Sequence, residues 1–166
     1  MGAFRDCTGL IEIKLPETLT MIDHATFTGC TGLTSIILPE SLVSIGASAF
    51  QGCTGLTSIS LPKCTNSIIY SAFKGCTSLT DIKVDENNLA FYAFEGILFD
   101  KNMTTLLLCP EGKKGECVIP KGVIKIRSGA FFGCNLLEKI IYSGKILIED
   151  GILEGFTGEL VYQEKN

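Results

Sequence analysis

A 23-residue unit repeats four times in succession in the first half of the chain, and this period constrains the fold more than any other feature. Four apolar residue types recur at this spacing, at Phe4, Phe27, Phe50 and Phe73; Cys7, Cys30, Cys53 and Cys76; Leu10, Leu33, Leu56 and Leu79; and Ile13, Ile36, Ile59 and Ile82. A unit this short cannot bury its own apolar face, so it has to stack on its neighbours. The period therefore predicts a solenoid with one coil per unit.

Each unit reads F-x-x-C-x-x-L-x-x-I-x-L-P-x-x-L-x-x-I. A period of about 20–29 residues with L-x-x-L-x-L spacing is typical of leucine-rich repeats. We expect a right-handed, mostly β leucine-rich-repeat solenoid, with short helical or 3₁₀ turns and a parallel sheet on its concave face. The expected strands of that sheet are Glu12–Leu15, Ser35–Leu38, Ser58–Leu61 and Asp81–Val84, where apolar and polar residues alternate. A short extended piece is expected opposite each strand.

The period breaks after Val84, where the next two motif positions hold Asp85 and Asn88 in place of Pro and Leu. Residues 96–110 contain two apolar runs around Asp100-Lys101-Asn102, which predicts a β-hairpin. Residues 111–116 read as a polar loop. The repeat phase then returns, because Pro120 precedes Phe131 by the same 11 residues that separate Pro39 from Phe50. We therefore expect one domain over 1–166, with four regular units in 1–84, a hairpin island inserted at 85–116, and resumed, degenerate units in 117–166.

Composition excludes several classes of partner. Hydrophobic residues make up 46% of the chain, which the apolar interior of each unit explains. The net charge is −4 and no basic stripe is present, which argues against nucleic acid and anionic membrane surfaces. No apolar run approaches the roughly 18 residues of a membrane span, so no membrane insertion is expected in this segment. Residues 41–62 carry no Asp, Glu, Lys or Arg; a weakly charged contact face and simple drift of the repeat both explain this.

The two ends of the chain look different. Met1-Gly2-Ala3-Phe4 enters the repeat in mid-unit, without the features of a signal peptide or a capping unit. We therefore expect the chain to be a fragment of a longer protein. Residues 155–166 read as a degenerate unit with a plausible natural end.

The eight cysteines invite disulfide and metal interpretations. No C-x-x-C pair with partner His or Cys is present, and no metal or other cofactor is expected. Cysteines in an in-register column lie about 5 Å apart with parallel side chains, farther than the roughly 3.5–4.5 Å between Cβ atoms of a disulfide. We therefore expect Cys7, Cys30, Cys53 and Cys76 to be reduced and inaccessible. A bridge between Cys109 and Cys117 is possible but less favoured than free thiols.

No catalytic constellation is present in the sequence. Exposed acids such as Glu12 and Asp81 have no His or second carboxylate at a position in the repeat that would bring it beside them. The sequence also contains no nucleophile elbow and no phosphate-binding loop. We therefore expect that the chain is not an enzyme.

The phrase A-F-x-G-C-T-G-L-T-S-I-x-L-P-x-S-L-x-S-I-G, seen almost entire over residues 31–59, resembles the BspA-like (Treponema-type) leucine-rich repeat. Residues 95–120 also resemble the non-repeat hairpin of that family. The resemblance implies a cell-surface or secreted protein, mainly of host-associated bacteria and some parasitic protists, that is associated with adhesion. The family has no shared catalytic residues, so the resemblance transfers no site.

Two functions remain open. The first is adhesion through protein–protein contacts on the concave sheet face, with a host extracellular-matrix or bacterial surface protein as partner. Its outward positions are Glu12, Lys14, Ser35, Ile37, Ser58, Ser60, Asp81, Lys83, Lys139 and Ile141. These positions include no aromatic anchor, which points to weak, multivalent contact. The second function is a structural spacer or stalk of a larger surface protein, with no binding activity of its own.

Overall fold

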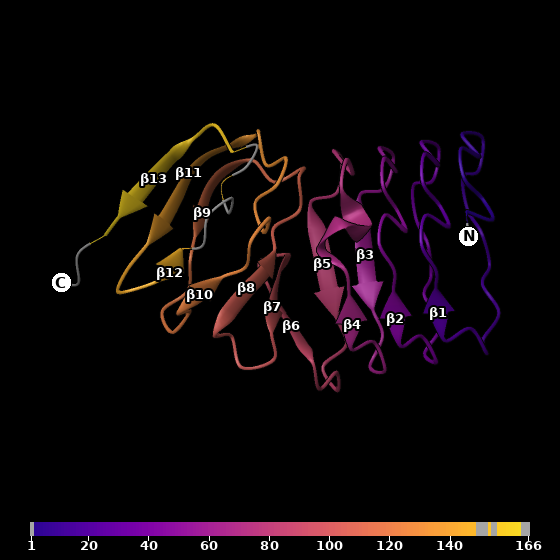
Figure 1. The fold of residues 1–166 in the computed structure, drawn as a ribbon, viewed down its shortest axis with the longest axis horizontal. Helices are drawn as coiled ribbons and strands as arrows, with labels where there is room; N and C mark the ends of the chain where they lie inside the picture. The colour runs from indigo at the N-terminus through magenta and orange to yellow at the C-terminus, as the bar shows by residue number, and fades with distance from the viewer. Residues whose placement is uncertain (1, 149–152, 154–155, 164–166) are drawn as a thin grey trace.

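The computed structural model describes residues 2–148, 153 and 156–163. It is a β-solenoid whose coils stack from the N-terminus towards the C-terminus along the long axis of the molecule (Figure 1). Helix is nearly absent: within the described residues it is limited to one 3₁₀ turn, η1 (Tyr70–Phe73), at the corner of the fourth unit. The predicted leucine-rich-repeat architecture is confirmed.

Short parallel strands run along two sides of the first four coils. On one side, β3 (Ser58–Leu61) pairs with β5 (Asp81–Val84), and Lys14 and Ile37 form an isolated parallel bridge in the preceding coils. On the other side, the strands are β1 (Met21–Ile22), β2 (Ser44–Ile45) and β4 (Ser67–Ile68). The expected four-stranded sheet is thus reduced to two strands and a bridge, whereas the opposite extended pieces form a three-stranded sheet.

The island is an antiparallel meander. Its strands are β6 (Phe91–Phe94), β7 (Ile97–Asp100) and β8 (Thr105–Leu108). The β7–β8 pair is the predicted hairpin, and the Asp100 carboxylate closes it by accepting hydrogen bonds from Thr104 N, Thr105 N and Thr104 Oγ1 at 2.7, 2.8 and 2.6 Å. Strand β6 was not predicted from the sequence.

The coils resume after β8. Strand β10 (Lys125–Ile126) pairs in parallel with β8 and with β12 (Leu147–Ile148), which extends the five-stranded sheet that starts at β6. Strands β9 (Gly115–Val118), β11 (Leu137–Tyr142) and β13 (Glu159–Tyr162) form a separate parallel sheet. The prediction of a loop through Glu116 was therefore wrong, because Gly115 and Glu116 pair with β11. The residues at both ends of the predicted terminal unit 155–166 lie outside the described residues.

Stacked phenylalanines form the axis of the regular coils. The ring centroids of Phe4, Phe27, Phe50 and Phe73 are 5.2, 5.3 and 5.5 Å apart in succession, with nearly parallel rings. The apolar interior continues as two clusters of buried residues that meet at β7. Leu98 packs with the regular coils, whereas its neighbours Ile97 and Phe99 pack with the resumed coils. Strand β7 is therefore buried on both faces.

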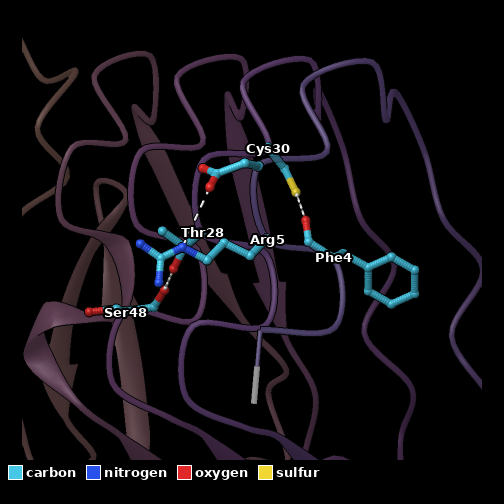
Figure 2. A network of polar contacts seen from close by, with 6 residues as sticks. Phe4, Arg5, Thr28, Cys30 and Ser48 are labelled. Carbon is cyan, nitrogen blue, oxygen red and sulfur yellow. Dashed lines mark hydrogen bonds and ion pairs between the residues drawn. The ribbon is translucent and has the colours of Figure 1, made fainter.

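The column of cysteines lines the corner of each coil. The Cys30, Cys53 and Cys76 thiols are buried and donate hydrogen bonds to the Phe carbonyl of the preceding unit at 2.9, 3.1 and 3.0 Å. Figure 2 shows the first of these bonds, from Cys30 Sγ to Phe4 O, beside the bond from Thr28 Oγ1 to Ser48 O. The prediction of inaccessible thiols was wrong for Cys7, which belongs to the first coil of the stack and is exposed.

Cys109 and Cys117 are free and buried in the structure. The neighbouring Cys117 and Cys134 thiols, together with burial, raise the pKa of Cys109, whereas the Cys109 thiol lowers the pKa of Cys117. The favoured expectation of free thiols at these two positions agrees with the structure.

The motif position that holds Leu in the first units becomes polar in the last two regular units. Thr65 replaces the motif Leu, and its hydroxyl donates to Leu42 O at 2.9 Å. One unit later, the buried Asn88 amide donates to Pro62 O and Thr65 O at 2.8 and 2.7 Å. The Asn88 carbonyl accepts from the backbone N–H groups of residues 90 and 91 at 2.9 and 2.8 Å. One side chain thus connects the last regular coils to the start of β6.

Candidate binding face

The predicted outward residues of the first four units lie on one face, which we call the strand face. It consists of two columns, Glu12–Ser35–Ser58–Asp81 and Lys14–Ile37–Ser60–Lys83. The pairs Ser58–Asp81, Ser60–Lys83 and Lys14–Ile37 are in direct register. Alternate residues of β3 and β5 point inwards, since Ile59 and Ile82 are buried. The structure therefore brings together eight of the ten predicted residues.

Ile37 is the most exposed apolar side chain of the strand face, with 86% of its surface accessible. It lies between two surface hollows of about 510 and 410 Å³ and lines both of them. The first hollow also contains Glu12, Lys14 and Ser35, and the second contains Ser60 and Lys83. Sequence reasoning identified these side chains, although it did not predict the hollows.

Acids outnumber bases in the two hollows. Their charged residues are the acids Glu12, Glu17, Glu40 and Asp85 and the bases Lys14 and Lys83. The Lys83 ammonium lies 3.6 Å from the Asp81 carboxylate, and both side chains are substantially exposed. Such an exposed pair contributes little to stability. The strand face around Ile37 is therefore apolar at its centre and acidic at its rim.

The remaining two predicted residues lie in a different sheet. Lys139 and Ile141 belong to β11. The turn at Glu95–Gly96 occupies the place next to β5, since Ile82 N donates to Gly96 O at 3.1 Å. This turn therefore separates β11 from β5. The Lys139 ammonium is 3.2 Å from the Glu116 carboxylate, which raises the pKa of Lys139. These two residues do not join the hollows around Ile37.

Ile141 lines a third hollow, of about 290 Å³, that contains two aromatic residues. Phe94 is 40% exposed there, beside Val118 and Tyr142. Sequence analysis found no aromatic residue near the outward positions because Phe94 lies in the unpredicted strand β6 and Tyr142 at the end of β11. The apolar run Phe91–Phe94 was the signal that could have indicated the former.

No group of three or more His, Cys, Asp or Glu residues in the described part of the chain is arranged to hold a metal ion. No helix among the same residues is long and apolar enough to cross a membrane.

Comparison with known proteins identifies the repeat. The model of the BspA type leucine rich repeat region matches residues 1–105 and 113–156, in six copies. The chain belongs to this family. Leucine-rich-repeat solenoids of the BspA type present extended surfaces to partners, as repeat proteins generally do. A comparison with curated proteins gives no significant match.

Solved structures share this BspA-type fold. A leucine rich cell surface protein from Faecalibacterium prausnitzii A2-165 is 25% identical, with a TM-score of 0.76 over 96% of this chain and 43% of its own. The pneumococcal vaccine antigen PcpA is 24% identical, with a TM-score of 0.73 over 91% of this chain and 39% of its own. The BspA-type chain described here thus spans less than half the length of either protein.

Proposed function

We propose that the chain is a protein-binding module displayed at the cell surface, and that it mediates adhesion through the strand face around Ile37. The observation that carries this proposal is the exposure of Ile37 between two hollows on a stacked scaffold. An isolated exposed apolar residue needs no explanation, but one that lines two adjoining hollows offers a place for a partner's side chain. The similarity to a described cell surface protein supports the location.

The charges around Ile37 define the partner that fits. Because the rim of the hollows is acidic, a partner segment with Lys or Arg flanking an apolar residue is complementary in charge. Host extracellular-matrix proteins and bacterial surface proteins are the partner classes we propose. The contact area around one Ile is small, so a single copy binds weakly and a multivalent display gains avidity.

A spacer without binding activity is the second candidate function. Interface anchors are usually aromatic or Arg, and the outward positions of the first four units include neither.

The two functions are separated by beads coated with wild-type protein, Ile37→Glu or Leu89→Glu. Leu89 is the matched control, because it is also 86% exposed but lies in the segment before β6 and lines neither hollow. We expect wild-type and Leu89→Glu beads to be retained on immobilised matrix proteins or bacterial cells. Ile37→Glu should reduce retention about tenfold, because the apolar burial of Ile37 is lost and a carboxylate is desolvated against the partner's apolar residue. Absence of wild-type retention, or equal retention of both variants, rejects the strand face and favours the spacer.

A further inference from the structure

The turn between β7 and β8 contains a sequence motif that the proposed function does not use. Asn102-Met103-Thr104 is an N-x-[ST] tripeptide with a residue other than Pro in the middle. This tripeptide is the acceptor motif for N-linked glycosylation. The chain has six asparagines, and Asn102 alone has Ser or Thr two positions later, so the motif occurs once.

An acidic residue stands two positions before this asparagine. Asp100 extends the motif to D-x-N-x-T over residues 100–104. Eukaryotic oligosaccharyltransferases recognise the tripeptide alone. Those of bacteria also require an acid at the position of Asp100. The turn between β7 and β8 therefore meets the sequence requirement of both classes of enzyme.

The structure leaves the acceptor side chain free. Residues 101–104 connect β7 to β8, and the Asn102 side chain is exposed there. The turn is held by its neighbours, because Met103 N donates to Asp100 O at 3.0 Å. The Asn102 amide forms no hydrogen bond with any described residue. A glycan on its Nδ2 atom therefore replaces no contact of the fold.

The other recognised residues of the motif are engaged in the folded turn. Thr104 Oγ1 donates to Asp100 Oδ2 at 2.6 Å, and the N–H groups of Thr104 and Thr105 donate to Asp100 Oδ1 at 2.7 and 2.8 Å. Hydrogen bonds to a charged carboxylate are among the stronger ones in proteins. An enzyme that reads the Thr104 hydroxyl has to compete with them. The motif is thus accessible in the unfolded chain, and folding withdraws it.

We propose that Asn102 is an N-glycosylation site, modified before the β7–β8 turn closes. The donor is an oligosaccharide linked to a polyprenyl diphosphate. A bond forms between Asn102 Nδ2 and C1 of the first sugar, while the bond between C1 and the diphosphate oxygen breaks. The amide loses one proton, and the polyprenyl diphosphate leaves with the electron pair of the broken bond.

This inference rests on the proposed location at the cell surface, because the transfer takes place on chains that cross a membrane. It does not rest on adhesion through the strand face. Asn102 lines neither of the two hollows beside Ile37, so the glycan is attached outside them.

Two expression systems test the acceptor, with a signal peptide placed before the full chain. One is a bacterium that carries a bacterial oligosaccharyltransferase and its lipid-linked oligosaccharide, and the other is a eukaryotic secretory cell. Mass spectrometry of the exported protein measures the glycan on Asn102. We expect modification in at least one system, and the system that modifies the chain identifies the class of enzyme. Unmodified Asn102 in both overturns the proposal. The added signal peptide separates this result from the bead assay and from the native location.

Substitutions locate the modification within the motif. Asn102→Gln and Thr104→Ala should each abolish the glycan, whereas Thr104→Ser keeps the hydroxyl and should retain it. Because Thr104→Ala also removes a bond that closes the turn, its loss of glycan cannot come from a less accessible acceptor. Asn135→Gln is the matched control, since Asn135 is exposed but lies outside any such motif. Glycan that persists in Asn102→Gln or Thr104→Ala contradicts the site.

The order of modification and folding needs a separate measurement. Purified enzyme from the system that modified Asn102 is given folded, unmodified chain or the same chain freshly diluted from urea, at equal final urea concentrations. We expect the diluted chain to be modified several-fold faster, because Thr104 and Asp100 are not yet bonded to each other. Equal rates would show that folding does not withdraw the acceptor, and would overturn that part of the proposal.

Discussion

The buried cysteine thiols act as small hydrogen-bonding core residues at the corners of the coils. Each of Cys30, Cys53 and Cys76 fills a narrow corner and also donates to a carbonyl of the preceding unit. Burial raises the pKa of Cys53 to about 12, so its thiol stays protonated at neutral pH. Because the thiolate is the reactive form, such cysteines are chemically inert in the folded state.

We expect alkylation of the folded protein to modify Cys7 and Cys64 quickly, since both are exposed, and Cys30, Cys53 and Cys76 slowly. Modification of Cys53 should remain slow at pH 9, below its raised pKa of about 12. Mass spectrometry of the alkylated peptides provides the measurement, and denatured protein, in which all eight cysteines react, provides the control. Rapid labelling of Cys53 in folded protein would count against this description.

The sequence predicted the burial of most of this column but not its hydrogen bonds. The 23-residue period shows that the cysteines share a position, yet it does not show how close a thiol comes to the carbonyl of the preceding coil. The period also treats all units as equivalent, which is why Cys7 was expected to be buried. Cys7 is exposed because it lies in the first coil of the described stack, whereas the buried Cys30 packs against the coil before it.

At the level of strands and turns, Asn88 marks the change from regular coils to the antiparallel meander. The repeat motif has Leu at this position, and Asn88 instead forms hydrogen bonds with two carbonyls and two N–H groups. This departure from the repeat motif therefore has a structural role.

We expect Asn88→Leu, which restores the motif residue, to lower the free energy of unfolding by about 2–4 kcal/mol, because buried backbone groups lose their partners. Leu89→Asn is the control, because Leu89 is 86% exposed and should tolerate an amide with little change. Urea denaturation of both variants gives the comparison. An Asn88→Leu protein as stable as wild type would show that water or a local rearrangement satisfies these groups.

The turn chemistry at Asp100 was sufficient to predict the β7–β8 hairpin. Strand β6 was missed because its apolar run, Phe91–Phe94, was not paired with β7 across the two-residue turn Glu95–Gly96.

In the molecule as a whole, β7 joins the two clusters of buried residues. Leu98 contributes to one cluster and Phe99 to the other, so loss of either cluster would expose one face of the same strand. We infer that residues 1–166 form a single domain, as the return of the repeat phase after the island suggests.

We therefore expect one cooperative unfolding transition by calorimetry. Leu98→Ala and Phe99→Ala, which create cavities on opposite sides of β7, should each lower the midpoint of that same transition, because large-to-small substitutions at buried sites cost about 2–5 kcal/mol. Two resolved transitions, each sensitive to only one of the variants, would instead establish two independent folding units.

The near-identity of the coils has a consequence for folding. The second and third units share the segment Thr-Gly-Leu-Thr-Ser-Ile, and each supplies a Phe, a Cys and a Leu at the same spacing. A growing chain could therefore align a coil with the wrong neighbour, one full unit out of step, at little cost to its apolar contacts. Thr65 and Asn88 are polar at a motif position that holds Leu in the first two units, so each makes its coil different from those coils. These two polar residues therefore break the equivalence between coils that the apolar residues alone leave in place.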